Sequence, residues 1–396
     1  MATISDPVHG YVKLDDLALD LVDTPQMQRL RWIKQLGLAN LVYPGANHTR
    51  FEHSLGAFHL ASRLAHHLEL DQEEQQELRA AVLLHDVGHG PLSHVTESVL
   101  ATYLRRDHED VNDLLRKNEL GEVLDTWGLD PARIQRLIKG ETSLGQIVNG
   151  EMDVDRMDYL VRDAHYTGVA YGVIDYQRLM EMIKIYRGQL VVEEGGIHAA
   201  ESLLVSRLLM YPTVYYHHVS RIAQSMIKSG ILCLIEEHGC DPGAIKDMCD
   251  LDLISAMSSA GGYPYEIVDR IRSRRLFKRA VYVGREGFES SVVSRENEKR
   301  IAGEIAKEAK VDPRYVLVDR PHLPRVAEGN VPVLVDGEVR SLREVSPLAT
   351  ILERAHHAAW RLGVYTTKED RERVGRAARS CLNIKRNPIQ KTFAEI

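Results

Sequence analysis

Histidine is concentrated in one part of this 396-residue chain. Nine of its 18 histidines lie between His48 and His108. Imidazole is the side chain that changes protonation near neutral pH, and its neutral form is a common metal ligand. The segment therefore gathers side chains that are suited to metal binding and to proton transfer.

Four short motifs contain the residues that could perform this chemistry. They are Arg50-Phe51-Glu52-His53, the run from His85 to His94, the pair His108-Glu109, and the run from Asp153 to Tyr159. Imidazole nitrogens and carboxylate oxygens from separate helices can hold one divalent cation and leave positions open for water and substrate. Such ligands suit Mn, Mg, Fe, Ni or Zn, so the sequence predicts one divalent metal ion without identifying it. The expected ligands are His53, His85, Asp86 and Asp155.

Simpler interpretations compete with this one. A single histidine near an apolar face is more often a hydrogen-bonded core residue than a ligand. The run from His85 to His89 also resembles the two-histidine helix of zinc proteases, with Asp in place of Glu. Gly88, Gly90 and Pro91 would interrupt the helical turn that this motif requires. The two histidines are therefore not expected to share a helix face, which argues against a protease.

The overall composition excludes several other classes of protein. With 44% hydrophobic and 27% charged residues the chain is typical of a soluble globular protein, and no apolar run reaches the roughly 18 residues of a membrane span. A net charge of −7 argues against a globally basic protein that coats nucleic acid. Four irregularly spaced cysteines do not form a disulfide framework. Residues 1–10 lack the pattern of a signal peptide, so a cytoplasmic location is expected.

Helical periodicity dominates the first 235 residues. Asp23-Thr24-Pro25 predicts the start of a helix that continues through Leu36. The loop at 37–50, rich in Gly, Asn and Pro, should bring the first histidine motif to the start of a helix. The alternating segment 189–198, which contains Glu194-Gly195-Gly196, predicts a small hairpin. Apolar residues at helical spacing predict further helices over 51–70, 78–86, 150–165 and 202–231.

The pattern changes beyond about Arg275. Short strand-like runs at 280–283, 315–318 and 331–335 are separated by a charged helix near 296–309, and a last helix is expected at 348–362. The seven basic residues of 371–391 are typical of a solvated end, while contact with a nucleotide, nucleic acid or a neighbouring subunit is an alternative. The predicted fold is mainly α, with a helical catalytic domain at 1–235, a helical extension at 236–275, a small mixed α/β subdomain at 276–345 and a helical C-terminal tail at 346–396.

Taken together, the motifs resemble the HD-domain phosphohydrolases, and within them the deoxynucleoside triphosphate triphosphohydrolases of the SAM-and-HD-domain type with their bacterial and archaeal relatives. The resemblance extends from about Ile4 to Lys228. Beyond Arg275 only Leu276-Phe277-Lys278 is similar, so the last third of the chain inherits little from it. The blocks that carry it include Asp6-Pro7-Val8-His9-Gly10, Thr24-Pro25-Gln26, Lys34-Gln35-Leu36-Gly37, Pro44-Gly45-Ala46, the histidine motifs and Asp163-Ala164-His165.

This resemblance implies a multi-helix HD core and a role for each matching residue. The metal ligands of the family fall on His53, His85, Asp86 and Asp155. The residues that hold the triphosphate fall on Arg50, His94, Arg156, Tyr159 and Arg207, although the closest relatives have lysine at Arg156. Those that bind the sugar 3′-hydroxyl fall on Gln35, Tyr159 and Asp163, and Tyr215 matches an aromatic that disfavours a 2′-hydroxyl. Those around the scissile α-phosphate fall on His89, His94, His108 and Glu109.

The chemistry of the residues agrees with these roles. A triphosphate carries about four negative charges, so an acidic protein can bind it only by gathering arginines and a metal in one cleft. Asp155, Tyr159 and Asp163 are four residues apart and would share a helix face, unless they form a solvated face with intrahelical pairs. His94 is the expected acid for the departing ester oxygen, with His108-Glu109 as the orienting pair or, alternatively, as a surface pair.

Three classes of function follow. The leading one is metal-dependent hydrolysis of a deoxynucleoside triphosphate to deoxynucleoside and inorganic triphosphate. A phosphomonoesterase or phosphodiesterase acting on another nucleotide would use the same metal site, but three arginines favour a polyphosphate. The third class is a noncatalytic module that binds a nucleotide or nucleic acid. The complete set of metal-binding side chains argues against it, because such a module would not require them.

Regulation by a second nucleotide is a further expectation from the resemblance. In the family, nucleotides between subunits assemble and activate a tetramer, and Asp23, Gln28 and Arg31 match residues that read a guanine there. Helix capping and a polar helix face would explain the same three residues. Near Ala2-Thr3 the chain lacks a lysine that some relatives place against the activator. We therefore expect a homo-oligomer, a tetramer or a dimer, with weaker or altered activation by a guanine nucleotide.

Overall fold

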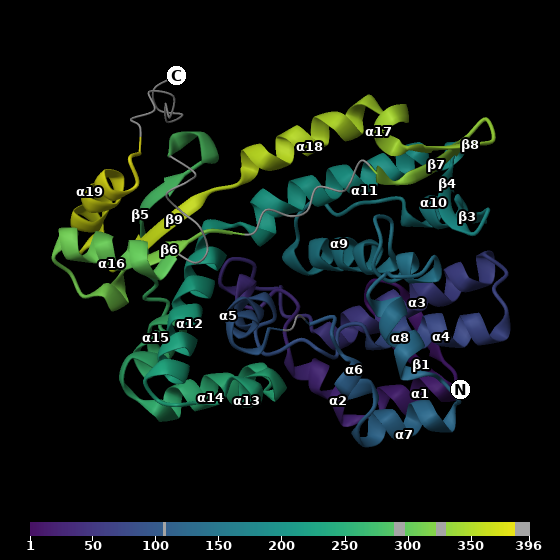
Figure 1. Cartoon of the computed structure of the whole chain (residues 1–396), viewed down its shortest axis with the longest axis horizontal. Helices are drawn as coiled ribbons and strands as arrows, with labels where there is room; N and C mark the ends of the chain where they lie inside the picture. The colour runs from purple at the N-terminus through teal and green to yellow at the C-terminus, as the bar shows by residue number, and fades with distance from the viewer. Residues whose placement is uncertain (106–107, 289–297, 322–329, 385–396) are drawn as a thin grey trace.

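The computed structural model describes residues 1–105, 108–288, 298–321 and 330–384. The chain is mainly helical, as predicted. It is elongated, with a main helical lobe at one end and a smaller lobe around a three-stranded sheet at the other (Figure 1). Within these ranges no helix is both long and apolar enough to cross a lipid bilayer.

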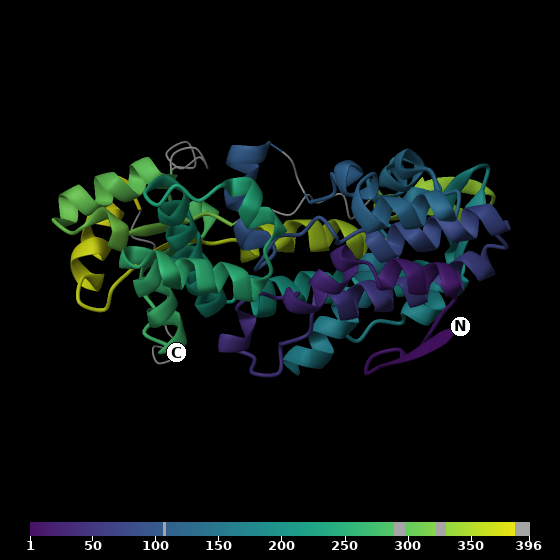
Figure 2. The ribbon, with the colours of Figure 1, turned by 90° about the horizontal axis from the view of Figure 1, so that it is seen from below.

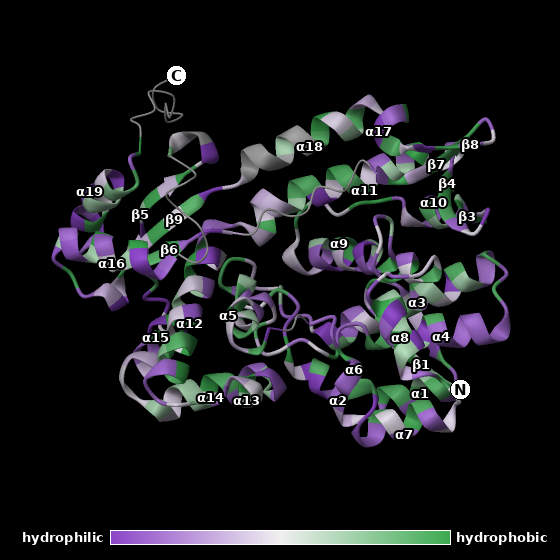
Figure 3. Cartoon of the chain, in the orientation of Figure 1, coloured by the Kyte–Doolittle hydropathy of each residue, from purple (hydrophilic) through white to green (hydrophobic). Residues whose placement is uncertain are grey.

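The main lobe is organised around α3 (Arg50–His67), which packs against α4 (Gln72–Leu84) and α9 (Val154–Thr167). A capping box between Thr49 and Glu52 starts α3, because each satisfies a free backbone N–H of the first turn. The first turn of α4 is hydrophilic and its hydrophobic residues follow (Figure 3). The surrounding elements are β1 (Ala2–Asp6), β2 (Gly10–Leu14), α1 (Asp16–Val22), α2 (Pro25–Arg29), α5 (His94–Leu104), α6 (Asn112–Leu115), α7 (Asn118–Thr126), α8 (Pro131–Ile138) and α10 (Tyr176–Glu181).

Two predicted helices are shorter than expected. The helix from Pro25 ends at Arg29, and after a 3₁₀ turn over Leu30–Trp32 the chain becomes extended and pairs Lys34 with Thr49. The predicted helix at 202–231 is divided into α11 (Ile197–Met210) and α12 (His218–Glu236) by a π-helical turn over Tyr211–Tyr215. Pro212 lies in this turn and has no N–H for a regular helix.

The hairpin predicted at 189–198 is wrong: only its first part, 189–193, is a strand, and this strand pairs with an earlier one. Strands β3 (Ile183–Tyr186) and β4 (Gln189–Glu193) are joined through Arg187 and Gly188, both with positive φ. Paired positive φ values match the twist of a tight hairpin. Glu194–Gly196, expected as the turn, instead forms a 3₁₀ turn that leads into α11.

The interval predicted as a helical tail supplies the central strand of the small lobe. β9 (Leu362–Thr366) lies between β5 (Lys278–Val283) and β6 (Leu317–Asp319), and all five of its residues are buried. A strand buried on both faces lacks the alternation that reveals strands in sequence. The helices α16 (Glu298–Ala309) and α19 (Arg371–Cys381) pack together beside this sheet.

Residues 330–360 form an arm that runs along the main lobe from β7, beside β4, back toward the small lobe (Figures 1 and 2). In the arm, β7 (Pro332–Val335) pairs in parallel with β4, and β8 (Glu338–Ser341) extends the sheet. Beyond α17 (Leu342–Val345), α18 (Pro347–Ala359) packs on α11. The structure thus differs from the predicted subdomain at 276–345, because β7 and β8 belong to a sheet of the main lobe.

The predicted helical extension connects the two lobes. It contains α13 (Pro242–Asp247), α14 (Asp250–Ala260) and α15 (Gly262–Arg272). Helices α14 and α15 pack with α12, and α13 packs with α5. A second hydrophobic cluster joins these helices to α5, so that Leu92 and Val95 share it with Ile245 and Leu253. The extension therefore contacts the segment that carries the histidine-rich motif.

Candidate active site

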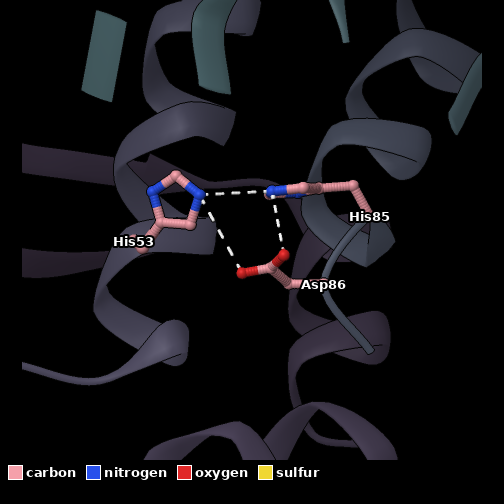
Figure 4. A group of neighbouring side chains, drawn as sticks. All are labelled: His53, His85 and Asp86. Carbon is pink, nitrogen blue, oxygen red and sulfur yellow. Dashed lines mark hydrogen bonds and ion pairs between the residues drawn. The ribbon is translucent and has the colours of Figure 1, made fainter. Parts of the chain in front are cut away.

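Three of the four expected metal ligands, His53, His85 and Asp86, have ligand atoms within 4.8 Å of one another, and Asp155 lies beside the two histidines. The Nε2 atom of His53 lies 3.2 Å from Nε2 of His85 and 2.9 Å from Oδ1 of Asp155. Asp86 completes the group, with Oδ1 3.4 Å from His85 Nε2 and Oδ2 3.9 Å from His53 Nε2 (Figure 4). Two ligand atoms that each lie about 2.1 Å from one cation are roughly 3 to 4 Å apart, which is close to the distances seen here. The donor set and spacing therefore fit one divalent metal ion bound by α3, the end of α4 and α9.

The outer nitrogens of both imidazoles are held by the protein. His53 Nδ1 lies 2.7 Å from Oδ2 of Asp158, and His85 Nδ1 lies 2.6 Å from the carbonyl of Val82. These partners accept the Nδ1 proton of each ring, which leaves Nε2 available to a metal. Asp158, which the sequence did not predict as a site residue, thus sets the orientation of His53.

The carboxylate of Asp86 is kept ionised. Burial alone would raise its pKa, but the Arg50 guanidinium 2.7 Å away and the neighbouring histidines hold it well below the usual range. Arg50 also donates from Nε to Oγ of Ser93, at 2.7 Å. Arg50, expected to hold the triphosphate, is therefore bonded to a metal ligand and to the loop before α5.

A second group of histidines lies beside the first. The rings of His89 and His108 stack with their centroids 3.9 Å apart, and the ring of His94 lies 5.6 Å from that of His89. His89 also lies 3.4 Å from Oδ1 of Asp86, which joins the two groups. The side chain of His94 is 74% exposed, so a substrate can reach it.

Glu97, and not Glu109, is the carboxylate that contacts His94 and His108. Its two oxygens lie 2.6 Å from Nδ1 of His108 and 3.0 Å from Nδ1 of His94. Burial would raise the pKa of Glu97, yet the two histidines hold it far below the usual range. Glu109 instead accepts a bond from the amide of Asn149. The i,i+3 spacing of His94 and Glu97 at the start of a helix was the available signal.

Beyond the metal ligand Asp155, helix α9 carries Tyr159 and Asp163, which lie beside other polar side chains. Tyr159 lies on α9 with its ring 6.5 Å from that of His53 and 6.3 Å from that of Tyr215. The hydroxyl of Tyr215 donates to Asp163 at 2.9 Å, and the other oxygen of Asp163 lies 2.8 Å from His48. The predicted stripe of Asp155, Tyr159 and Asp163 thus lies on one helix, and His48 is a member that was not predicted.

Cationic and polar groups surround this stripe. Arg156, on α9, is half-buried and bonded to Asp153. Burial would lower the pKa of its guanidinium, but the carboxylate of Asp153 raises it, against an opposing effect of the nearby Arg207. The Arg207 guanidinium lies 5.9 Å from the ring centre of Tyr211. Gln35 Oε1 and His89 Nδ1 are buried and make no hydrogen bond within the described part of the chain. Buried polar atoms of this kind are rare in folded proteins and favour a polar ligand.

The three residues expected to read a guanine lie together at the junction of α1 and α2. The Gln28 amide donates to the carbonyl of Val22, next to Asp23, and Arg31 donates to Oε1 of Gln28 at 2.8 Å. Asp23 ends α1 through its backbone N–H. Arg31 also lies over the ring of Phe51, 3.6 Å from its centre.

Comparison with known proteins shows which family the chain resembles over most of its length. The HD domain matches residues 50–163 and the HD associated region matches residues 174–393. An uncharacterized protein of Methanocaldococcus jannaschii is 36% identical over 93% of this chain and 80% of its own length. The deoxynucleoside triphosphate triphosphohydrolase SAMHD1 homolog of Dictyostelium discoideum is 33% identical, and the match covers 69% of this chain but only 59% of that protein.

A solved structure shares the whole fold. The crystal structure of a phosphohydrolase from Bacteroides thetaiotaomicron superposes with a TM-score of 0.76 at 26% identity, covering 93% of this chain and 100% of that chain. The chain belongs to the HD-domain phosphohydrolase family.

Removal of a metal ligand should release the metal ion. His53→Ala, Asp86→Ala and Asp86→Asn should each lower the metal content of the purified protein at least about tenfold, because ligand sets depend strongly on each member. Metal analysis after dialysis measures this content, and circular dichroism checks that helical content is retained.

The matched control is His66→Ala, which removes an exposed histidine from the same helix α3. It should keep full metal content. If Asp86→Asn and His53→Ala retained as much metal as this control, the proposed metal site would be wrong.

Proposed function

We propose that this protein hydrolyses deoxynucleoside triphosphates to deoxynucleoside and inorganic triphosphate. The main support is one continuous arrangement: the metal-ligand group, the histidines beside it, and the tyrosine–aspartate group farther along α9. Its ends suit a phosphate and a sugar hydroxyl. Arg156 and Arg207 supply positive charge for a polyphosphate, which a monoester would not require.

At the phosphate end, the ligand residues would hold one divalent ion, which polarises the α-phosphate when bound. A water molecule attacks the α-phosphorus and loses a proton to solvent as the bond to the 5′-oxygen breaks. His94 donates a proton to this departing 5′-oxygen. Glu97 keeps His94 and His108 oriented, since it contacts Nδ1 of both rings and leaves their Nε2 atoms for the substrate. His89 faces the same region through its stack with His108.

At the sugar end, the hydroxyl of Tyr215 and the carboxylate of Asp163 are hydrogen-bonded to each other and form one polar side of the site. Burial and the neighbouring Asp163 raise the pKa of Tyr215 well above the usual value, so the phenol stays neutral and donates to that carboxylate. Asp163, Tyr159 and Gln35 then remain as partners for a 3′-hydroxyl, and the Tyr215 ring excludes a 2′-hydroxyl.

A substrate panel tests the function. Purified protein should be incubated with each dNTP, with NTPs and with a generic phosphodiester in the presence of Mn²⁺ or Mg²⁺. Inorganic triphosphate from at least one dNTP is the expected product. Turnover of the phosphodiester alone would favour the second class, and turnover of none would favour a binding module.

Replacement of the proposed acid should reduce turnover much more than binding. His94→Ala should lower kcat about 10²-fold or more, because the leaving oxygen then departs without a proton. Glu97→Gln should lower kcat less, since the ring remains but loses its ionised partner.

The control for this pair is His198→Ala, which breaks a similar His–Glu contact at the start of α11, where His198 is 97% exposed. Steady-state kinetics should give the same kcat and KM for His198→Ala as for the unmodified protein. A His94→Ala variant with turnover near that of the control would transfer the role to another histidine.

Sugar discrimination should depend on the Tyr215 ring. Tyr215→Ala should narrow the ratio of kcat/KM between dNTP and NTP at least about tenfold, because the ring no longer occupies the space of a 2′-hydroxyl. Tyr215→Phe keeps the ring and should keep most of the discrimination. Equal turnover of dNTP and NTP by the unmodified protein would refute this role.

We also propose a homo-oligomer in which Asp23, Gln28 and Arg31 bind a guanine nucleotide. Turnover of a second dNTP should then rise with dGTP or GTP, and Asp23→Ala should abolish this rise, because the carboxylate accepts from the guanine N1 and N2 hydrogens. Asp16→Ala, an exposed aspartate on α1, is the control. A monomer that is fully active on one dNTP without activator would contradict this proposal only.

A further inference from the structure

The loop between α4 and α5 contains a strained backbone. Leu92 and Ser93, directly before His94, have φ of 53° and 52°. Residues with a β-carbon rarely adopt this region, and such strain persists only where the surroundings hold it. The conformation of these two residues sets where α5 begins, and therefore where His94 and Glu97 lie.

A buried carboxylate from the helical extension holds this strained segment. Asp250, the first residue of α14, accepts from the Leu92 N–H at 2.7 Å with one oxygen and from the Lys34 N–H at 3.0 Å with the other. Asp250 is only 8% exposed to solvent. One carboxylate thus connects the segment before His94 with the segment before Gln35.

Arg29 connects the same loop to the helical extension from another direction. Its guanidinium donates to the carbonyls of Val87 and His89 in the loop, at 2.9 and 2.7 Å, and to the carbonyl of Met248 at 2.9 Å. A planar fork of donors is suited to bridging several carbonyls. Arg29 therefore attaches the loop to the residues directly before Asp250.

The two segments that Asp250 holds differ in their other support. The segment with Lys34 and Gln35 is also bonded to 48–50: Gln35 N–H donates to His48 and Arg50 N–H donates to Ile33. The loop before α5 has side-chain contacts to Ser93 Oγ, from Arg50, and to carbonyls, from Arg29, while the backbone N–H of Leu92 is bonded to Asp250. Loss of Asp250 should therefore release the backbone at Leu92, whereas the backbone bonds to 48–50 keep Gln35 in place.

We propose that Asp250 is a positioning residue for the reaction, supported by Arg29, and that it acts by holding Leu92 and Ser93 so that His94 and Glu97 face the substrate. The inference rests on the proposed function for its catalytic consequence. It makes the helical extension a part of the active site, although none of its residues is expected to touch the substrate.

The kinetic test compares variants of two aspartates on α14. Asp250→Ala should lower kcat at least about tenfold and change KM less than about threefold, with unchanged metal content. Asp250→Asn keeps the oxygen that accepts from Leu92 and should recover a large part of kcat. Asp252→Ala is the control: its exposed carboxylate caps the same helix through Cys249 N–H but does not contact the loop.

Two kinetic results would overturn the proposal. One is an Asp250→Ala variant with kcat within about twofold of the unmodified protein. The other is an equal loss of kcat in Asp250→Ala and Asp252→Ala, which would indicate general destabilisation of α14.

Hydrogen exchange tests the inference without any substrate. Amides of the segment 88–100 should exchange at least about tenfold faster in Asp250→Ala than in the unmodified protein or in Asp252→Ala. Equal exchange in all three would overturn the positioning role. Absence of dNTP hydrolysis by the unmodified protein, in contrast, would refute the proposed function and leave the exchange result to decide the positioning.

Discussion

The candidate site depends on a buried carboxylate that is not itself an expected metal ligand. Asp158 lies 2.7 Å from His53 Nδ1 and 2.7 Å from His9 Nε2, and it accepts two bonds from Arg162. Burial would raise its pKa, but Arg162 and the histidines hold it well below the usual range. Gly56 permits this approach, because a β-carbon there would lie 1.9 Å from the carboxylate. The pairing offsets the large cost of burying these charges.

This network fixes three separate parts of the chain around the metal ligands. Arg162 also donates to Asp6, so the N-terminal hairpin is attached to α9, and His53 attaches α3 to the same helix. Farther along α9, Tyr159 and Asp163 continue the line of polar side chains from the metal ligands to the hydroxyl of Tyr215. An acidic chain can thereby present a local surface suited to an anion, since a few buried, oriented cations outweigh the distant net charge.

Local signals in the sequence predicted part of this site. The ligand types were visible in short motifs, and the spacing of Asp155, Tyr159 and Asp163 indicated one helix because helical periodicity is local. The contacts of Glu97, Asp158 and Asp250 depend on how distant helices pack. Sequence motifs therefore suggested His108 with Glu109, where the structure joins His108 to Glu97.

The fold shows the same division between local and distant information. The helices α3, α4 and α9 of the main lobe were predicted from their apolar residues, whereas β9 is buried on both faces and its partners are distant in sequence. The pairing of β7 with β4 joins residues about 140 positions apart, so no local pattern could reveal the arm.

In the proposed reaction, water attacks the α-phosphorus while His94 protonates the departing 5′-oxygen. Hydrolysis of a dNTP in ¹⁸O-water, followed by ³¹P NMR and mass spectrometry, tests this reaction most directly. The expected products are unlabelled deoxynucleoside and inorganic triphosphate that carries one ¹⁸O on a terminal phosphoryl group. Label in the deoxynucleoside, or pyrophosphate with deoxynucleoside monophosphate as products, would contradict it.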